Sequence, residues 1–159
     1  MGHPKKQRKK YESPKKPYDK SRIESEKKIK QIFGLRRKHE IWRAEGILRN
    51  FRRRARELQA IHDETAKKML FEKLRSIGLP CSSLEDVLEL KLEDILSRRL
   101  QTIIHKKGFA NSIKHARQLI VHGHVYVAGK RIVWPSYIVK KNEEDKITLN
   151  PKIIKEKGV

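Results

Sequence analysis

The densest cluster of chemically capable side chains is a run of arginines in the first half of the chain. Five guanidinium groups fall within eight residues, at Arg49, Arg52, Arg53, Arg54 and Arg56. Only two acidic residues, Glu45 and Glu57, lie close enough in sequence to pair with them. The planar guanidinium fork can bind two phosphate oxygens at once. The run therefore predicts contacts with a phosphate backbone, and a solvated basic face is the alternative.

A second group of polar side chains lies in the last third of the chain and suits the same kind of ligand. It combines cations with other hydrogen-bonding groups: Arg99, Lys107, Ser112, Lys114, His115, Arg117, Gln118 and His122. Several of them share one side of a predicted helix that starts at Ser112, where free backbone N–H groups can also bind a phosphate. We expect these residues to form one RNA-binding surface.

Other kinds of chemistry have weak support. His122 and His124 could suggest a metal site, but two histidines without two further ligands nearby are more simply histidines that pack or contact RNA. Cys81 is the only cysteine, so no disulfide within the chain and no cysteine-rich zinc site are expected. The sequence has no glycine-rich phosphate loop, nucleotide fingerprint or nucleophile elbow. We therefore expect no enzyme activity and no cofactor.

The charge of the chain indicates a polyanionic partner. Lys and Arg number 40 against 19 Asp and Glu, which gives a formal net charge of +21. Residues 1–60 carry +14, residues 61–95 carry −3 and residues 96–159 carry +10. A membrane surface is the rival partner, but no apolar run approaches the roughly 18 residues of a spanning helix, and no signal peptide is visible. Nucleic acid is therefore the expected partner, without a membrane.

The second group of residues needs two helices to position it. Apolar residues recur at steps of three and four within 92–104, which predicts one helix over about 92–107 that Gly108 ends. Ser112 can cap a second helix that Gly123 ends. Each helix would bury one face and leave the other for hydrogen bonding.

A small sheet is expected after the second helix, because the apolar period changes to two. Val125 and Val127 alternate with polar residues, and the Ala-Gly pair at 128–129 predicts a hairpin tip. Apolar residues within 132–139 predict more strand. A polar turn at 142–145 should precede a last strand.

The first half of the chain is predicted to be helical. Helices are expected over about 22–33 and 38–61, then from Asp63 or Thr65 to Gly78, then a short one from Ser83, which resembles a capping box with Asp86. The second helix has a narrow apolar stripe, at Ile41, Ala44, Leu48, Phe51, Ala55 and Leu58. The third should bury Ala66, Met69, Leu70, Leu74 and Ile77.

Residues 1–20 form a basic arm that cannot bury a core of its own. They contain eight basic residues and three prolines, so the arm should be disordered when free. It could fold onto RNA, with phosphate contacts from Lys5, Lys6, Arg8, Lys9 and Lys10 and with Tyr11 or Tyr18 stacked on bases. A solvated tail is the alternative.

The order of short motifs resembles a known family. The runs RRLQ (98–101), SIKHARQLI (112–120), HGHVYV (122–127) and PSYIV (135–139) closely resemble the S-four domain, a small RNA-binding fold. The runs PKKQRKKYESP (4–14), GLRRKHEIW (34–42) and NFRRRAR (50–56) resemble the N-terminal pieces of the S-four family of small-subunit ribosomal proteins, in its archaeal and eukaryotic form. Gln101 and Ala128 depart from the usual Asp and Asn of the domain.

This resemblance implies a fold and a role. The fold would be α+β, with a basic arm over 1–20, a helical arginine-rich domain over 21–92, an S-four RNA-binding domain over 93–150 and a tail over 151–159. The role would be that of a primary binder of small-subunit ribosomal RNA on the cytoplasmic ribosome, which nucleates assembly of the subunit body. The resemblance also implies a neighbouring S-five protein, a position near the messenger RNA entry path and a contribution to decoding accuracy.

Two other functions use the same domain. An S-four-domain factor that acts on free ribosomal particles is the main alternative, although such factors are shorter and lack an arginine-rich helical N-terminus. An appendage of an enzyme, as in pseudouridine synthases or tyrosyl-tRNA synthetases, would need a separate catalytic domain, for which this chain has neither the length nor the strand content.

Overall fold

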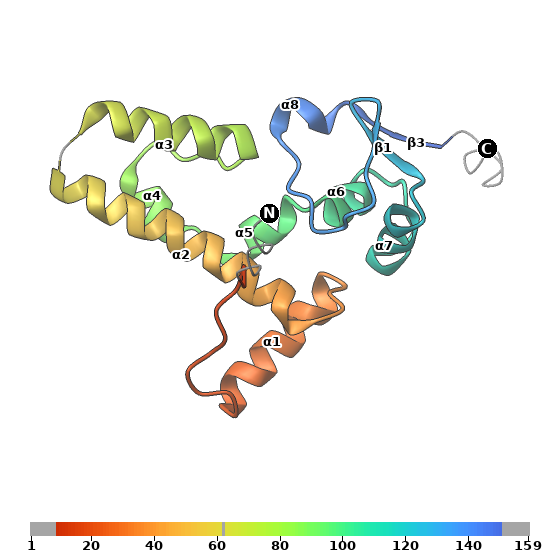
Figure 1. Cartoon of the computed structure of the whole chain (residues 1–159), viewed down its shortest axis with the longest axis horizontal. Coiled ribbons are helices and arrows are strands. Elements are labelled where there is room, and N and C mark those ends of the chain that lie inside the picture. Colours follow the sequence, from red (N-terminus) through yellow and green to blue (C-terminus); the bar gives the residue numbers. More distant parts are fainter. Residues whose placement is uncertain (1–8, 62, 151–159) are drawn as a thin grey trace, which may run out of the picture.

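The computed structural model describes residues 9–61 and 63–150, in two parts that follow one another along the chain (Figure 1). The N-terminal part contains α1 (Lys20–Ile32), α2 (Lys38–Ile61), α3 (Glu64–Ile77), α4 (Leu84–Glu89) and α5 (Leu92–Ser97). The C-terminal part contains α6 (Leu100–Lys106), α7 (Ile113–Val121), β1 (Val125–Val127), β2 (Lys130–Arg131), α8 (Lys141–Glu144) and β3 (Ile147–Leu149). The predicted α+β class, with helices before a small sheet domain, is confirmed. No helix in the two described ranges is long and apolar enough to cross a membrane.

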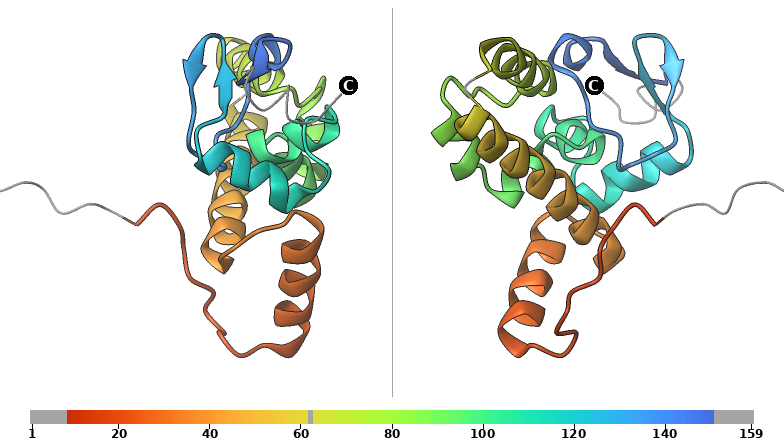
Figure 2. Two further views of the ribbon diagram at one scale, coloured as in Figure 1. Left: turned by 90° about the vertical axis from the view of Figure 1, so that its right-hand side faces the viewer. Right: turned by 60° about the vertical axis from the view of Figure 1, so that its left-hand side comes forward.

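The long helix α2 organises the N-terminal part. It has the predicted bounds, and the whole predicted stripe is buried, at Ile41, Ala44, Leu48, Phe51, Ala55 and Leu58. The other helices of this part, α1, α3, α4 and α5, all contact α2 (Figure 2). The helix therefore fixes the arginines of its outer face relative to one hydrophobic core.

Local sequence signals set several helix ends. Asp63 caps α3, and Gly78 follows this helix in the left-handed conformation, with φ of +87°. Ser83 and Asp86 form the predicted capping box at the start of α4. These ends need no long-range information, because each depends on side chains within a few residues of the helix.

The C-terminal core lies between α6, α7 and a three-stranded antiparallel sheet of order β2-β1-β3. In this sheet Val125 lies opposite Leu149, and Val127 lies opposite Ile147. All four side chains are buried, as the period of two predicts. The sheet thus holds α6 and α7 from one side and leaves polar residues of α7 exposed on the other.

The hairpin between β1 and β2 has the predicted tip. Ala128 and Gly129 both have positive φ, of 49° and 77°. Two such residues in a two-residue connection make the turn whose twist matches antiparallel strands. Ala128 pays a conformational cost there, because its Cβ disfavours the left-handed region.

Residues 92–107 do not form the single helix that their apolar period predicts. Arg98 and Arg99 interrupt it, and Arg99 is extended and forms an antiparallel bridge with the segment 132–139. The N–H of Leu100 donates to the carbonyl of Tyr137 at 2.7 Å. The N–H of Val139 donates to the carbonyl of Arg98 at 3.0 Å. The returning chain thus binds backbone groups that a continuous helix would use internally.

The predicted strand over 132–139 is wrong except at this bridge and at Ile132, whose N–H donates to the carbonyl of Val125 at 3.1 Å. The N–H of Tyr137 donates to the carbonyl of Trp134 at 3.1 Å, so the chain turns there instead of extending. Pro135, within the turn, has no N–H to give to a sheet. Val133 and Trp134 are exposed as a result.

Two smaller predictions were wrong as well. Residues 142–145 are not a simple turn, because 141–144 form the short helix α8. Met69 was expected inside, but 66% of it is exposed, since Leu70 and Leu74 provide the buried side of α3.

Side chains reach across between the two parts. The buried amide of Gln101 donates to the carbonyls of Gly34 and Ile113, each at 3.1 Å. Gly34 has φ of +56°, and a Cβ there would lie 2.9 Å from Ile113, so only glycine fits this close approach. On another side, Arg98 donates through Nε to the carbonyl of Ile77 at 2.7 Å. A carboxylate at position 101 could not donate to the carbonyls of Gly34 and Ile113 as the Gln101 amide does.

Candidate nucleic-acid interface

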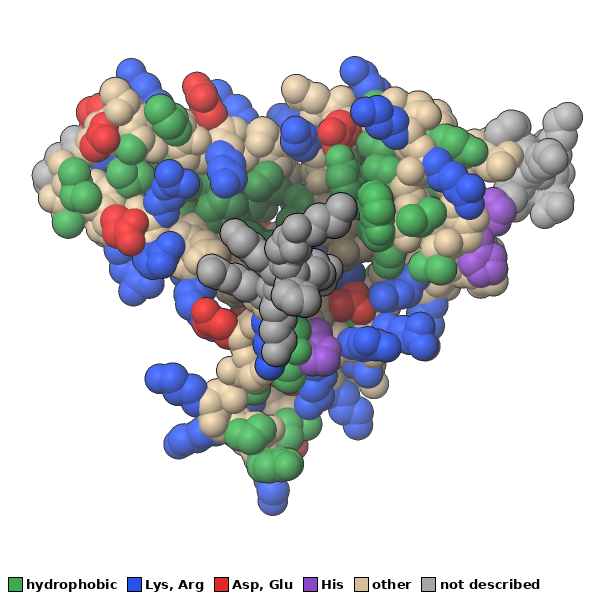
Figure 3. Space-filling model, in the orientation of Figure 1, with side chains coloured by type: hydrophobic (Ala, Val, Ile, Leu, Met, Phe, Trp, Pro, Cys, Tyr) green, Lys and Arg blue, Asp and Glu red, His purple; other side chains and the backbone are tan. Residues whose placement is uncertain are grey.

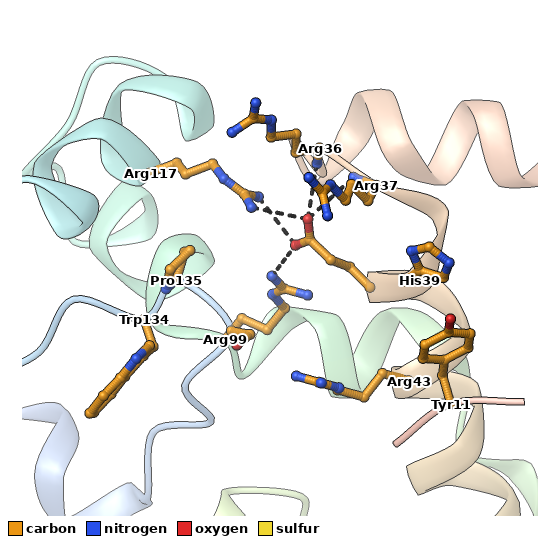
Figure 4. Close-up of a pocket in the computed structure, with 11 residues that line it drawn as sticks. Tyr11, Arg36, Arg37, His39, Arg43, Arg99, Arg117, Trp134 and Pro135 are labelled. Atoms are coloured by element: carbon orange, nitrogen blue, oxygen red, sulfur yellow. Dashed lines mark hydrogen bonds and ion pairs between the residues drawn. The ribbon is translucent and has the colours of Figure 1, made fainter. Parts of the chain in front are cut away.

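A single carboxylate, Glu40, lies at the centre of an arginine cluster where the two parts meet (Figure 4). Arg117 of α7 forms two hydrogen bonds with it, of 3.0 and 3.1 Å. Arg99 binds the same carboxylate at 2.5 Å. The backbone N–H groups of Arg36 and Arg37 donate to it at 3.2 and 3.3 Å. Glu40 therefore ties the start of α2 to both helices of the C-terminal part.

The electrostatics of this cluster favour the charged form of Glu40. Burial raises the pKa of Glu40, but the hydrogen bonds and charges of Arg117 and Arg99 outweigh burial, so the pKa lies below its usual range. Burial lowers the pKa of Arg99, and Glu40 partly offsets that. Because the carboxylate stays ionised, it can hold two guanidinium groups at once.

Next to the cluster lies a cavity of about 560 Å³ that opens to solvent. Five arginines line it, at Arg36, Arg37, Arg43, Arg99 and Arg117, against the single carboxylate of Glu40. The other lining residues are Tyr11, His39, Trp134, Pro135 and Ser136. We call this space the junction cavity. Its charge suits an anion, and its rings suit a flat partner.

Two further hollows continue from the junction cavity along α2. The first shares Tyr11 and Arg43 with it and extends to Arg49 and Asn50. The second shares Asn50 and extends to Arg53, Arg54 and Glu57. The α2 positions that line one or another of these hollows include a row that steps by three or four residues, at 40, 43, 47, 50, 54 and 57. One side of the molecule along α2 thus carries a basic track, in which Lys and Arg outnumber the acidic Glu12, Glu40 and Glu57. Figure 3 shows one face of the molecule, with Lys and Arg spread over it among hydrophobic side chains.

The arginines of the predicted run differ in exposure and in their partners. Arg53 and Arg54 are exposed, and the ion pair of Arg53 with Glu57 is long, at 3.7 Å. Arg56 is exposed and donates to the carbonyl of Arg52 at 3.3 Å. Arg52 is half-buried and donates to the carbonyl of Leu90 at 2.6 Å, so it also serves the protein core.

The second predicted group is divided in the same way. Ser112 caps α7, and Lys114, Gln118 and His122 are exposed beside the half-buried His115. Lys107 is half-buried and binds the backbone carbonyl of Glu144 and, at 3.6 Å, the carboxylate of Asp145. Arg99 and Arg117 are held by Glu40. The exposed face of α7 is therefore smaller than the predicted surface.

The basic arm is described only from Lys9 onward. Lys9 and Lys10 are exposed, and the ring of Tyr11 lies 4.4 Å from that of His39 and 5.8 Å from that of Trp42. The predicted contacts at Lys5, Lys6 and Arg8 lie outside the described residues. The stacking expected of Tyr11 is thus directed at α2 in this structure.

The remaining sequence candidates offer no separate site. The rings of His122 and His124 lie 6.1 Å apart, and no group of three or more potential metal ligands occurs within 9–61 and 63–150. Cys81 is buried, and burial raises the pKa of its thiol, so the thiolate is disfavoured.

Sequence reasoning missed much of the junction cavity. Arg36, Arg37, His39 and Trp134 were not singled out, although an arginine pair directly before a long helix was a usable signal. The role of Glu40 had no signal in the sequence, because its two arginine partners lie 59 and 77 residues away.

Comparison with known proteins agrees with this arrangement. The S4 domain family matches residues 98–147, which contain α6, α7 and the sheet up to β3. The chain is 44% identical over 156 residues to the small ribosomal subunit protein uS4 of Methanothermobacter thermautotrophicus, covering 95% of this chain and 91% of that protein. It is 46% identical over 156 residues to uS4 of Ignicoccus hospitalis, covering 95% and 94% of the two chains. Similarity of this extent includes the arginine-rich helical part as well as the domain.

Proposed function

Because the chain belongs to the uS4 family of small ribosomal subunit proteins, a family without enzymatic activity, we propose that it binds small-subunit ribosomal RNA as a structural component of the ribosome. The observation that carries this proposal is the basic track along α2, which leads from exposed arginines to the junction cavity. A long cationic surface suits a polyanion.

The proposed mechanism is charge neutralisation by a prearranged surface. Each arginine or lysine that meets a phosphate releases counterions and adds about 0.9 for duplex RNA, or about 0.7 for a single strand, to the salt dependence of binding. The core beneath α2 and the network around Glu40 fix the positions of these groups before RNA arrives. Little backbone freedom is then lost on binding, which favours affinity.

The proposed contacts combine residues from both parts of the chain. They are the arm residues Lys5, Lys6, Arg8, Lys9 and Lys10, the α2 residues Arg52, Arg53, Arg54 and Arg56, and the C-terminal residues Arg99, Lys107, Ser112, Lys114, His115, Arg117, Gln118 and His122. Among these, we assign the direct phosphate contacts to the exposed side chains and a supporting role to Arg52, Arg99 and Arg117, which bind the protein itself.

The finer role rests on the family resemblance. We propose that the protein binds early to the RNA of the subunit body, nucleates assembly there, and contributes to decoding accuracy. Its expected neighbours are the S-five protein and messenger RNA at the entry path, on the cytoplasmic ribosome. The basic arm, the helical region over 21–92 and the domain over 93–150 would each contribute to this role, with 151–159 as a tail.

The test is binding of the full chain to the isolated 5′ domain of small-subunit ribosomal RNA over a salt series, with a random RNA of equal length as competitor. We expect binding that survives competition and that weakens steeply with salt. Equal binding to both RNAs would contradict a primary assembly role. Absence of the protein from salt-washed small subunits, with recovery on free large-subunit particles, would favour a recycling factor instead.

A further inference from the structure

The junction cavity has a feature that phosphate binding alone does not use, because aromatic rings stand on two sides of it. Figure 4 shows Trp134 and Pro135 on one side and His39 and Tyr11 on the other, with guanidinium groups between them. We propose that this cavity receives one unpaired nucleotide of the bound RNA, with its base against Trp134 and its phosphate among Arg36, Arg37 and Arg43. The inference rests on the proposed function and specifies the ligand at one point of that interface.

The arginines of the cavity fall into two classes. Arg99 and Arg117 are bound to Glu40, which also accepts the N–H groups of Arg36 and Arg37. The guanidinium groups of Arg36, Arg37 and Arg43 are exposed, and within the described ranges they have no ion-pair or hydrogen-bond partner. Glu40 has no remaining capacity to neutralise them, so three cations face the opening together.

Trp134 supplies the surface for a base. It is 64% exposed, although a tryptophan gains most from burial, and it sits in the turn before Pro135. A stacked base would cover its ring without requiring any particular hydrogen-bond pattern. On the far side the rings of Tyr11 and His39 lie 4.4 Å apart, and that of Trp42 lies 5.1 Å from His39. These rings meet at angles of 46° and 85°, so this side of the cavity is aromatic but not flat.

The size of the cavity selects among anionic partners. About 560 Å³ is in the range of pockets that hold a single small ligand, so a base-paired duplex cannot enter. An acidic peptide could satisfy the arginines but would leave the exposed indole without a partner. A nucleotide turned out of its helix satisfies both, and unpaired bases stacked on aromatic side chains are how proteins commonly recognise RNA.

The test compares two probes on the full-length chain by fluorescence anisotropy at low salt. One probe is labelled single-stranded hexauridylate, and the other is a hexamer of abasic ribose phosphates with the same charge. We expect the wild type to prefer the probe with bases by about five-fold or more, the effect of one stacked base. In Trp134→Ala this preference should disappear while binding of the abasic probe persists. Because Trp134 is exposed, this variant should keep its far-UV circular dichroism and melting curve.

A charge variant tests the phosphate side. Arg36→Ala/Arg37→Ala should weaken both probes alike, and more than Lys27→Ala/Lys28→Ala, which removes the same charge from exposed positions of α1. A base preference unchanged in Trp134→Ala would overturn the proposal. The proposal would also be overturned if a hexaglutamate peptide displaced the labelled probe as well as unlabelled hexauridylate does, because the cavity would then be assigned to an acidic protein segment.

The same preparations are titrated with the 5′ domain of small-subunit ribosomal RNA against the competitor RNA. A wild type that does not discriminate between these two RNAs would remove the proposed function itself. The wild type could instead discriminate between the two RNAs while Trp134→Ala keeps both this discrimination and the preference for the probe with bases. That result would remove the nucleotide site alone.

Discussion

Two pairs of consecutive arginines in this chain, Arg53–Arg54 and Arg98–Arg99, have opposite surroundings. Arg53 and Arg54 lie exposed on α2, and the side chain of Arg53 is 70% exposed. Arg98 and Arg99 lie between α5 and α6, where the side chain of Arg99 is only 6% exposed. The first pair has one long ion pair to Glu57, and the second binds Glu40, Glu144 and the carbonyl of Ile77. Arginine therefore has two roles in this chain: an exposed pair is free for a ligand, and a buried pair binds other parts of the protein.

The energetics of the two pairs should differ accordingly. Exposed ion pairs contribute about 0–1 kcal/mol to folding, because water and salt screen them. Removing one partner of a buried pair costs about 3–5 kcal/mol, because the other charge stays behind without water. We therefore expect Arg53 and Arg54 to affect RNA binding without affecting folding. Arg98 and Arg99 should affect folding first and RNA binding only as a consequence.

The largest expected effect tests this division with the same substitution at the two acidic partners. Glu40→Ala leaves Arg99 and Arg117 without their carboxylate, and we expect it to lower the free energy of unfolding by about 3 kcal/mol. Glu57→Ala removes the partner of an exposed arginine and should change it by no more than about 0.5 kcal/mol. Urea denaturation followed by circular dichroism measures both. Equal losses in the two variants would contradict the division.

The sequence predicted one of these pairs better than the other. The bounds of α2 and the exposure of Arg53 and Arg54 follow from a helical period that extends over six buried positions. The surroundings of Arg99 depend on a backbone bridge to Ile138 and on Glu40, which are 39 and 59 residues away in the chain. Such contacts leave no local period. The same limit explains why a single helix was predicted over 92–107, while the caps at Ser112 and Ser83 were correct.

The next effect concerns RNA and should appear only at the exposed pair. Arg53→Ala/Arg54→Ala should lower the slope of log affinity against log salt by about 1.4 for single-strand contacts or about 1.8 for duplex contacts. The melting curve should be unchanged. Arg52 is left intact, because it donates to the carbonyl of Leu90 and its loss would also affect the core. An unchanged slope for the 5′ domain RNA would place the pair outside the interface.

Acid should weaken the buried cluster by neutralising Glu40. The pKa of Glu40 is lowered in the folded state, so its stabilising effect is fully present above the unfolded value of about 4.3 and is lost as the pH falls below it. The stability difference between wild type and Glu40→Gln should therefore be constant from pH 7 to about 5 and shrink towards pH 3. Other acidic groups, such as Asp86, titrate in both proteins and cancel. A difference independent of pH would show that Glu40 acts by shape and not by charge.

The smallest effect adds stability without touching any charge. Ala128→Gly relieves a left-handed residue with φ of 49°, a conformation that costs an L-residue about 1–2 kcal/mol. The greater flexibility of glycine in the unfolded chain offsets part of this gain, so a net increase of about 0.5 kcal/mol is expected. Ala60→Gly, the same change near the end of α2, should instead lower the free energy of unfolding. Thermal melting of both variants measures the two signs.

This substitution also shows whether the buried arginines join the two cores into one folding unit. Trp42 lies in the N-terminal part, where its indole N–H donates to Glu26 at 2.9 Å, and it reports on that core in a Trp134→Phe background. If Glu40 couples the cores, Ala128→Gly should raise the midpoint of the Trp42 transition, although the hairpin belongs to the other core. With Glu40→Gln added, the gain should vanish from Trp42 and remain in the C-terminal core. If Ala128→Gly left the midpoint of the Trp42 transition unchanged even with Glu40 present, the arginines would hold the interface without coupling the folding of its two sides.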